Sequence, residues 1–189
     1  MTQNDINTKY LEFLNEALSA ENAAIDRITS RMDQTPLTEV KQRLQQHLEE
    51  TRNQQNRLNQ IITRLNGDPT DSKADLPKLM PPSTMMLKKT VKDTIKSITD
   101  DKKDNPLPEE MELMQLKQDA LIEGAEIVAY ETLIEITKRI NSSSIPNEEI
   151  ISALKQSLEE EKNMHKWCKE NMPMAIDNLL PKIISAISK

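Results

Sequence analysis

Apolar residues recur every three or four positions over most of this chain, which is the spacing of one face of an α-helix. Four long helices are predicted, at about residues 4–32, 35–65, 108–140 and 147–172. Thr35 suits the N-cap of the second helix and Pro36 suits its first turn. Asn66-Gly67-Asp68-Pro69 is typical of a helix stop, and Asn147 suits the cap of the fourth helix.

Two further segments flank these helices. Residues 68–82 contain four prolines and predict an irregular crossover, followed by a short amphipathic helix at about 83–98 and a polar loop at 100–106. After Met172 the apolar spacing continues, with a kink or break expected at Pro181. This tail could be a docking helix, a dimer contact or a membrane-surface helix. A membrane role is disfavoured because its polar face has few cations.

The order of these elements predicts the fold class. Two helix pairs joined by a long crossover define an all-α, ferritin-like four-helix bundle. A weak internal repeat agrees, since residues 19–24 resemble residues 124–129. We therefore expect a bundle over residues 1–172 and an amphipathic tail helix over residues 173–189.

Composition and charge narrow the function. The formal net charge is −6, which argues against nucleic acid as a partner because phosphate binding needs clustered Lys and Arg. Cys168 is the only cysteine, so no intramolecular disulfide can form. No apolar run reaches the length of a signal peptide core or a membrane span, so a cytoplasmic protein without a membrane partner is expected. With only two glycines, a nucleotide-binding loop is not expected.

Acidic side chains interrupt the apolar stripe of each helix near its midpoint. A buried carboxylate is costly unless it is paired, hydrogen-bonded or bound to a metal. A Glu and a His one turn apart, as at Glu161 and His165, are what a metal site inside a bundle needs. The candidate ligands are Glu21 on the first helix, Glu50 and Gln54 on the second, Glu123 and Glu126 on the third, and Glu161 and His165 on the fourth.

Structural alternatives exist for several of these residues. Glu21 could be a buried acid hydrogen-bonded to Tyr10 or Tyr130, and His165 could be a core histidine with satisfied hydrogen bonds. Gln54 is a neutral amide and a poor ligand, whereas His47 could substitute as a ligand on the second helix. Iron and manganese suit a set of carboxylates with imidazole, and zinc could also occupy it.

At these residues the chain resembles the YciE/YciF group of ferritin-like stress proteins. The matching segments are residues 19–21, 47–51 with Gln54, 123–133 and 158–162, which occur in the family's order within residues 8–170. The resemblance implies a ferritin-like bundle, generally dimeric, with a dinuclear metal site at Glu21, Glu50, Gln54, Glu126 and Glu161, with Glu123 close by. Gly124 and Gln54 replace histidines found in relatives, so the site could be asymmetric, mononuclear or empty.

Two functions follow from this set of residues. The leading hypothesis is a di-iron or manganese protein in metal handling or oxidative-stress defence, with dioxygen or peroxide as a reaction partner. If it is an enzyme, it would be an oxidoreductase of the ferroxidase or peroxidase type. The rival is a metal-free helical-bundle module for interaction or dimerisation, in which hydroxyls, amides and water hold the inward acids.

Overall fold

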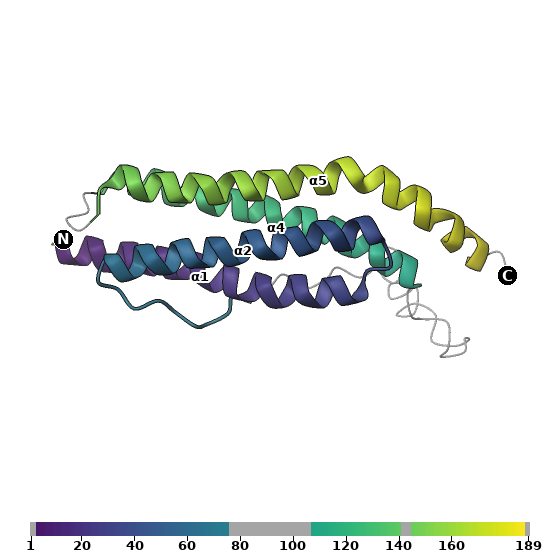
Figure 1. Cartoon of the computed structure of the whole chain (residues 1–189), viewed down its shortest axis with the longest axis horizontal. Helices are drawn as coiled ribbons and strands as arrows, with labels where there is room; N and C mark the ends of the chain where they lie inside the picture. The colour runs from purple at the N-terminus through teal and green to yellow at the C-terminus, as the bar shows by residue number, and fades with distance from the viewer. Residues whose placement is uncertain (1–2, 76–106, 141–144, 188–189) are drawn as a thin grey trace, which may run out of the picture.

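Four helices build the chain in its computed structural model, which describes residues 3–75, 107–140 and 145–187. They are α1 (Gln3–Gln34), α2 (Thr38–Arg64), α4 (Pro108–Thr137) and α5 (Asn147–Ile187) (Figure 1). α1 packs on α2 and α4 packs on α5, and the two hairpins meet through α2 with α5 and α1 with α4. The predicted all-α four-helix bundle is confirmed. The helix predicted at 83–98 and the loop at 100–106 lie outside the described residues.

The turn between α1 and α2 differs from its prediction. α2 begins at Thr38, with Leu37 rather than Thr35 in the N-cap position. The Thr35 hydroxyl accepts the N–H of Leu37 at 3.3 Å and donates to the buried carboxylate of Glu112 at 2.8 Å. The hydroxyl is thus used in a tertiary contact, because a buried carboxylate needs donors. The assignment of Thr35 as the helix cap was wrong.

The stop after α2 is confirmed. Asn66 takes a left-handed conformation with φ of 59°, and the N–H of Gly67 donates to the carbonyl of Ile62 at 2.9 Å. This is the closing bond of a Schellman-type helix end. The following segment then runs along α1, where the N–H of Ala74 donates to the carbonyl of Ser19 at 2.9 Å.

The α4–α5 hairpin corrects two predicted helix ends. α4 ends at Thr137 rather than Ile140, and the side chain of Asn147 donates to the carbonyls of both residues. α5 does not end near Met172 but continues through Pro173 and Pro181 to Ile187. One stripe of this extension, Ala175, Leu179 and Ile183, is buried, and its packing outweighs the backbone hydrogen bonds that the prolines remove. The division between a bundle and a tail domain stays a prediction.

A polar layer separates two apolar clusters along the bundle. The first cluster includes Leu14, Leu58, Leu133 and Leu154, and the second includes Ile28, Leu44, Leu116 and Met164. Between them, in the order of each helix, lie the buried polar residues Glu21, His47, Thr51, Gln54, Glu123 and Glu161. The apolar clusters therefore close off this layer on both sides along the bundle axis. In such a low-dielectric interior, the charges of the layer interact strongly.

None of the helices within the described ranges is long and apolar enough to cross a membrane. The cytoplasmic location expected from the sequence stays a prediction.

Candidate metal centre

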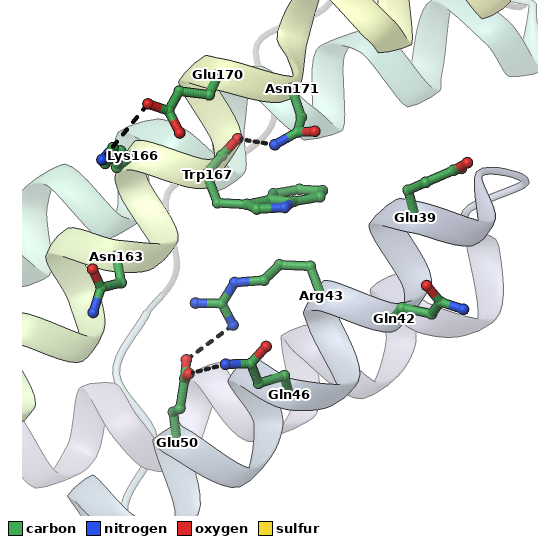
Figure 2. Close-up of a pocket in the computed structure, with 10 residues that line it drawn as sticks. All are labelled: Glu39, Gln42, Arg43, Gln46, Glu50, Asn163, Lys166, Trp167, Glu170 and Asn171. Carbon is green, nitrogen blue, oxygen red and sulfur yellow. Dashed lines mark hydrogen bonds and ion pairs between the residues drawn. The ribbon is translucent and has the colours of Figure 1, made fainter.

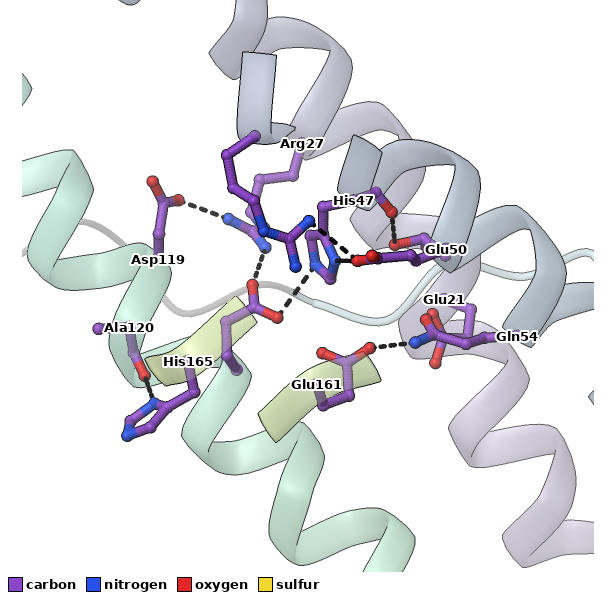
Figure 3. A network of polar contacts seen from close by, with 12 residues as sticks. Glu21, Arg27, His47, Glu50, Gln54, Asp119, Ala120, Glu161 and His165 are labelled. Carbon is purple, nitrogen blue, oxygen red and sulfur yellow. Dashed lines mark hydrogen bonds and ion pairs between the residues drawn. The ribbon is translucent and has the colours of Figure 1, made fainter. Parts of the chain in front are cut away.

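Three residues from three helices bring potential metal ligands together in the polar layer. His47 of α2, Glu123 of α4 and Glu161 of α5 each offer a ligand atom, and these atoms all lie within 4.8 Å of one another. All three residues are buried, with at most 1% of each exposed. Figure 3 shows His47 and Glu161 within one network of polar contacts between the helices. Imidazole with two carboxylates is a ligand set that borderline divalent metals prefer.

Several buried oxygens in this cluster lack hydrogen-bond donors. Gln54 donates through Nε2 to Glu161 Oε1, which leaves Gln54 Oε1 and Glu161 Oε2 without a partner among the described residues. Glu123 Oε2 lies 3.0 Å from His47 Nε2 but accepts no hydrogen bond of good geometry. A buried acceptor without a donor costs about 1–3 kcal/mol. A cation at the triad would satisfy the oxygens of Glu123 and Glu161, so the residues fit a metal ion.

Glu50 stands behind His47 on the side nearer solvent. Its Oε2 lies 3.2 Å from His47 Nδ1 and accepts a hydrogen bond of 3.0 Å from Arg43 Nη1. A carboxylate on one imidazole nitrogen fixes the ring and leaves the other nitrogen free to bind a metal. The geometry therefore suits Glu50 to orienting His47, with Nε2 facing Glu123.

Arginines neutralise the acids on the α1–α4 side of the cluster. Arg27 donates to Glu123 Oε1 at 3.0 Å and to Asp119 Oδ1 at 2.7 Å. Arg31 in turn donates to Asp119 at 3.1 Å and to Glu112 through two nitrogens at 2.7 and 2.9 Å. Each of these carboxylates is thus paired with a fixed cation, as burial requires.

Neutral partners hold the acids on the opposite side. The hydroxyl of Tyr130 donates to Glu21 Oε1 at 2.5 Å, and the amide of Gln54 donates to Glu161. Burial, with the charge of Glu126, raises the pKa of Glu21 well above its usual range. Burial, with the charges of Glu123 and Glu126, does the same to the pKa of Glu161. Without a cation, Glu161 and Glu21 are therefore favoured in the protonated, neutral form.

The pKa values of the remaining titratable groups, Glu126, His47 and Glu123, are shifted in different directions. Burial and the charge of Glu123 raise the pKa of Glu126 to about 7. Burial opposes the charged form of His47, but Glu123 and Glu50 outweigh it and raise its pKa to about 9. Burial likewise opposes the charged form of Glu123, yet His47 and Arg27 hold the pKa of this carboxyl below its usual range. Without metal, the cluster binds protons that a divalent cation would displace.

This proton binding predicts that the chelated protein loses stability as pH rises. Glu21, Glu126, Glu161 and His47 have raised pKa values when folded, so the folded state holds protons that the unfolded chain has released. Their stabilisation is full below the unfolded pKa values and is lost as pH rises through the folded ones. We expect the free energy of unfolding to fall by about 1–3 kcal/mol between about pH 6 and pH 8.

Urea unfolding in the presence of a chelator measures this change. The lowered pKa of Glu123 acts only below about pH 4.5, where its stabilisation is lost, and does not mask the effect. A free energy of unfolding that is flat or rises over the same interval would contradict the charge distribution described above.

The sequence-predicted ligands are only partly brought together. Glu123 and Glu161 belong to the cluster, and Gln54 contacts it directly while Glu21 lies beside it (Figure 3). Glu126 is partly buried on the next turn of α4. Glu50 contacts His47 from outside, as described above.

His165 lies away from the triad. Its Nδ1–H donates to the carbonyl of Ala120 at 2.8 Å, in the interface between α4 and α5. Gly124 faces the ring, since a Cβ added there would lie 3.6 Å from it. His47 supplies the imidazole of the cluster instead. The sequence held that signal, because His47, Thr51 and Gln54 continue the apolar stripe of α2 whereas Glu50 does not.

The fold and the site together define a class of protein, a four-helix bundle with a buried histidine–carboxylate cluster at its centre. The sequence matches the family described as "Domain of unknown function (DUF892)" over residues 5–180, and the chain belongs to this family. The match continues past Met172, where the resemblance noted from sequence was expected to end. Among curated proteins, none matches the sequence.

Solved structures of similar fold include three bacterial proteins. The E. coli stress protein YciF has a TM-score of 0.65 and 20% identity, covering 94% of this chain and 98% of that one. A Xanthomonas campestris protein has a TM-score of 0.69 and 16% identity, covering 94% and 97%. YcfI from Rhodopseudomonas palustris has a TM-score of 0.58 and 23% identity, covering 89% and 94%. The resemblance to the YciE/YciF group is confirmed.

Proposed function

We propose that this protein binds a redox-active metal in its core and acts in metal handling or oxidative-stress defence. The observation behind this proposal is that buried ligand atoms of His47, Glu123 and Glu161 lie within 4.8 Å of one another, while one oxygen each of Glu123 and Glu161 has no hydrogen-bond partner among the described residues. YciF, which has a similar fold, is described as a stress protein, and this supports the proposed role in stress defence.

The donor set favours iron or manganese, with zinc as the alternative. Carboxylate, amide oxygen and imidazole are hard or borderline ligands. The only thiol, Cys168, is buried in an apolar cluster, and burial raises its pKa to about 12, so it does not offer a thiolate. His47, Glu123 and Glu161 would hold one ion. Glu21, Gln54 and Glu126 supply the oxygens for a second, which would complete the dinuclear form.

The metal would supply electrons to dioxygen or peroxide when it is bound in the ferrous or manganous state. The chain's own residues prepare the site for that chemistry. Glu50 fixes the orientation of His47, Arg27 holds Glu123 ionised, and Tyr130 positions Glu21. The apolar clusters on both sides exclude bulk water from the polar layer.

Thermal unfolding with and without metal tests the proposal. A ligand that binds only the folded state raises stability, by about 2.7 kcal/mol at a hundredfold excess over its dissociation constant. We expect Mn²⁺, or Fe²⁺ under nitrogen, to raise the melting temperature of the chelated protein, and Mg²⁺ to have a much smaller effect because it prefers oxygen ligands alone. Unchanged melting with every transition metal would reject metal binding.

The rival function is a metal-free interaction module, working as a homodimer. Leu121 and Val128 are exposed on the outer face of α4 (73% and 61%) and favour contact with another protein surface. Homodimerisation through this face is compatible with metal binding, so both proposals can hold together. Sedimentation of wild type and Leu121→Glu would separate a dimer from a monomer.

A further inference from the structure

A groove between α2 and α5 opens beside the metal centre. It has a volume of about 590 Å³, and its lining includes Arg43, Glu50 and Trp167. Figure 2 shows Arg43 and Glu50 on the α2 side and Trp167 on the α5 side. The outer rim is well exposed, since Lys166 and Glu170 are 71% and 63% exposed. The groove is therefore open to solvent at this rim.

Glu50 links this groove to the buried cluster. Its side chain is 18% exposed and lines the groove, yet its Oε2 lies 3.2 Å from Nδ1 of His47, a residue that is 1% exposed. The other nitrogen of the same ring lies 3.0 Å from Glu123. A continuous series of ligand-type atoms thus runs from the groove through Glu50 and His47 to the interior site.

The charges in the groove favour a cation. Three carboxylates, of Glu39, Glu50 and Glu170, face two cationic side chains, of Arg43 and Lys166. Both cations are already engaged, Arg43 with Glu50 at 3.0 Å and Lys166 with Glu170 at 3.7 Å. Amide oxygens from Gln42, Gln46, Asn163 and Asn171 complete a lining rich in oxygen ligands.

We infer that this groove is the route by which a divalent cation reaches the core, with Glu50 as the carboxylate that receives it before His47 and the interior acids do. This inference rests on the proposed metal binding. A hydrated ion would exchange part of its water shell for the Glu50 carboxylate at the floor of the groove. The ion would displace the two donors that hold this carboxylate on the groove side, Arg43 at 3.0 Å and Gln46 at 2.9 Å, before it passes inward.

The test is the rate of Mn²⁺ uptake by the chelated full-length protein. Trp167 is the only tryptophan in the chain and lines the groove, so its fluorescence reports arrival in stopped flow. Glu50→Gln keeps an oxygen that can accept from His47 Nδ1–H but removes the charge. We expect its association rate constant to fall about tenfold, the scale of electrostatic steering. Its dissociation rate should rise as well, because Glu50 also orients His47, so the association rate is the quantity that tests the route.

Glu160→Gln provides the matched control. Glu160 is also partly exposed (19%) and also paired with an arginine, Arg57, but it does not line the groove or contact His47. Its association rate should match wild type. If Glu50 only orients His47, Glu50→Gln would raise the dissociation rate and leave the association rate unchanged, which overturns the inference. A lower Mn²⁺ content per chain at saturating Mn²⁺ would also overturn it, because Glu50 would then be a resident ligand.

Failure of the underlying proposal gives a different result. If the wild-type protein takes up no Mn²⁺ at all, metal binding itself is rejected. If the wild type loads and Glu50→Gln loads equally fast, only the route through the groove is rejected.

Discussion

Replacing Glu161 with glutamine will stabilise the chelated protein by about 1–3 kcal/mol, although it alters a residue at the centre of the core. Without metal, Glu161 is held against Glu123 in a buried layer, and burial and neighbouring acids raise its pKa well above the usual range. Glutamine has nearly the same shape and no charge. Its oxygen can accept a hydrogen bond from Gln54 while its amide donates toward Glu123, so both of these neighbours have a suitable hydrogen-bond partner.

Urea unfolding with a chelator at about pH 8 measures this gain, because the carboxylate is most costly there. Glu159→Gln is the control, since Glu159 is 67% exposed on the same helix and should change stability by less than about 0.5 kcal/mol. A destabilised Glu161→Gln protein would show that the carboxylate is compensated without metal. A buried carboxylate that lowers the stability of the metal-free protein is typical of a functional site, since activity often requires strained or destabilised groups.

Replacing Arg27 with methionine will destabilise the fold by about 3–5 kcal/mol. Arg27 donates to Asp119 at 2.7 Å and to Glu123 at 3.0 Å, and both carboxylates are buried. Methionine keeps the unbranched stem and the helix propensity of arginine but leaves these charges facing only Arg31 and His47. Removing one partner of a buried ion pair is far more damaging than removing an exposed one.

Arg64→Met provides that comparison. Arg64 pairs with Glu149 on the surface, where both side chains are 52% exposed, so its loss should cost far less stability than the loss of Arg27. Chemical unfolding of the two variants at one pH gives the difference. Equal losses would mean that the Arg27 contacts are well hydrated and do not neutralise the acids of the core.

The fold could be predicted from sequence because its signals are local and repeated. Helical spacing and the Asn66-Gly67 stop indicate the same bundle, and both agree with the described residues. The helix ends that were wrong depend on tertiary contacts. Thr35 turns to Glu112 instead of capping α2, and the buried face of α5 continues the helix through two prolines.

The site could be predicted in outline but not in detail. Inward acids on three helices are visible in the apolar stripes, and Glu21, Glu123 and Glu161 are buried as expected. On α2 the expected acid, Glu50, lies nearer the solvent. Which imidazole joins them depends on how each helix is rotated about its axis. Adjacent residues on a helix face differ by tens of degrees, so His165 turns toward α4 while His47 points inward. The arginines that neutralise Glu123 and Asp119 come from a different helix and leave no local pattern.

The most direct test of the metal centre is elemental analysis after reconstitution with Fe²⁺ under nitrogen, using protein purified without affinity nickel. The account predicts about one to two ions per chain in wild type, their loss in His47→Gln and Glu161→Gln, and their retention in His165→Ala. No metal in wild type would contradict the account. Loss of metal in His165→Ala with retention in His47→Gln would contradict it equally, because the ligands would then lie on the other face of α5.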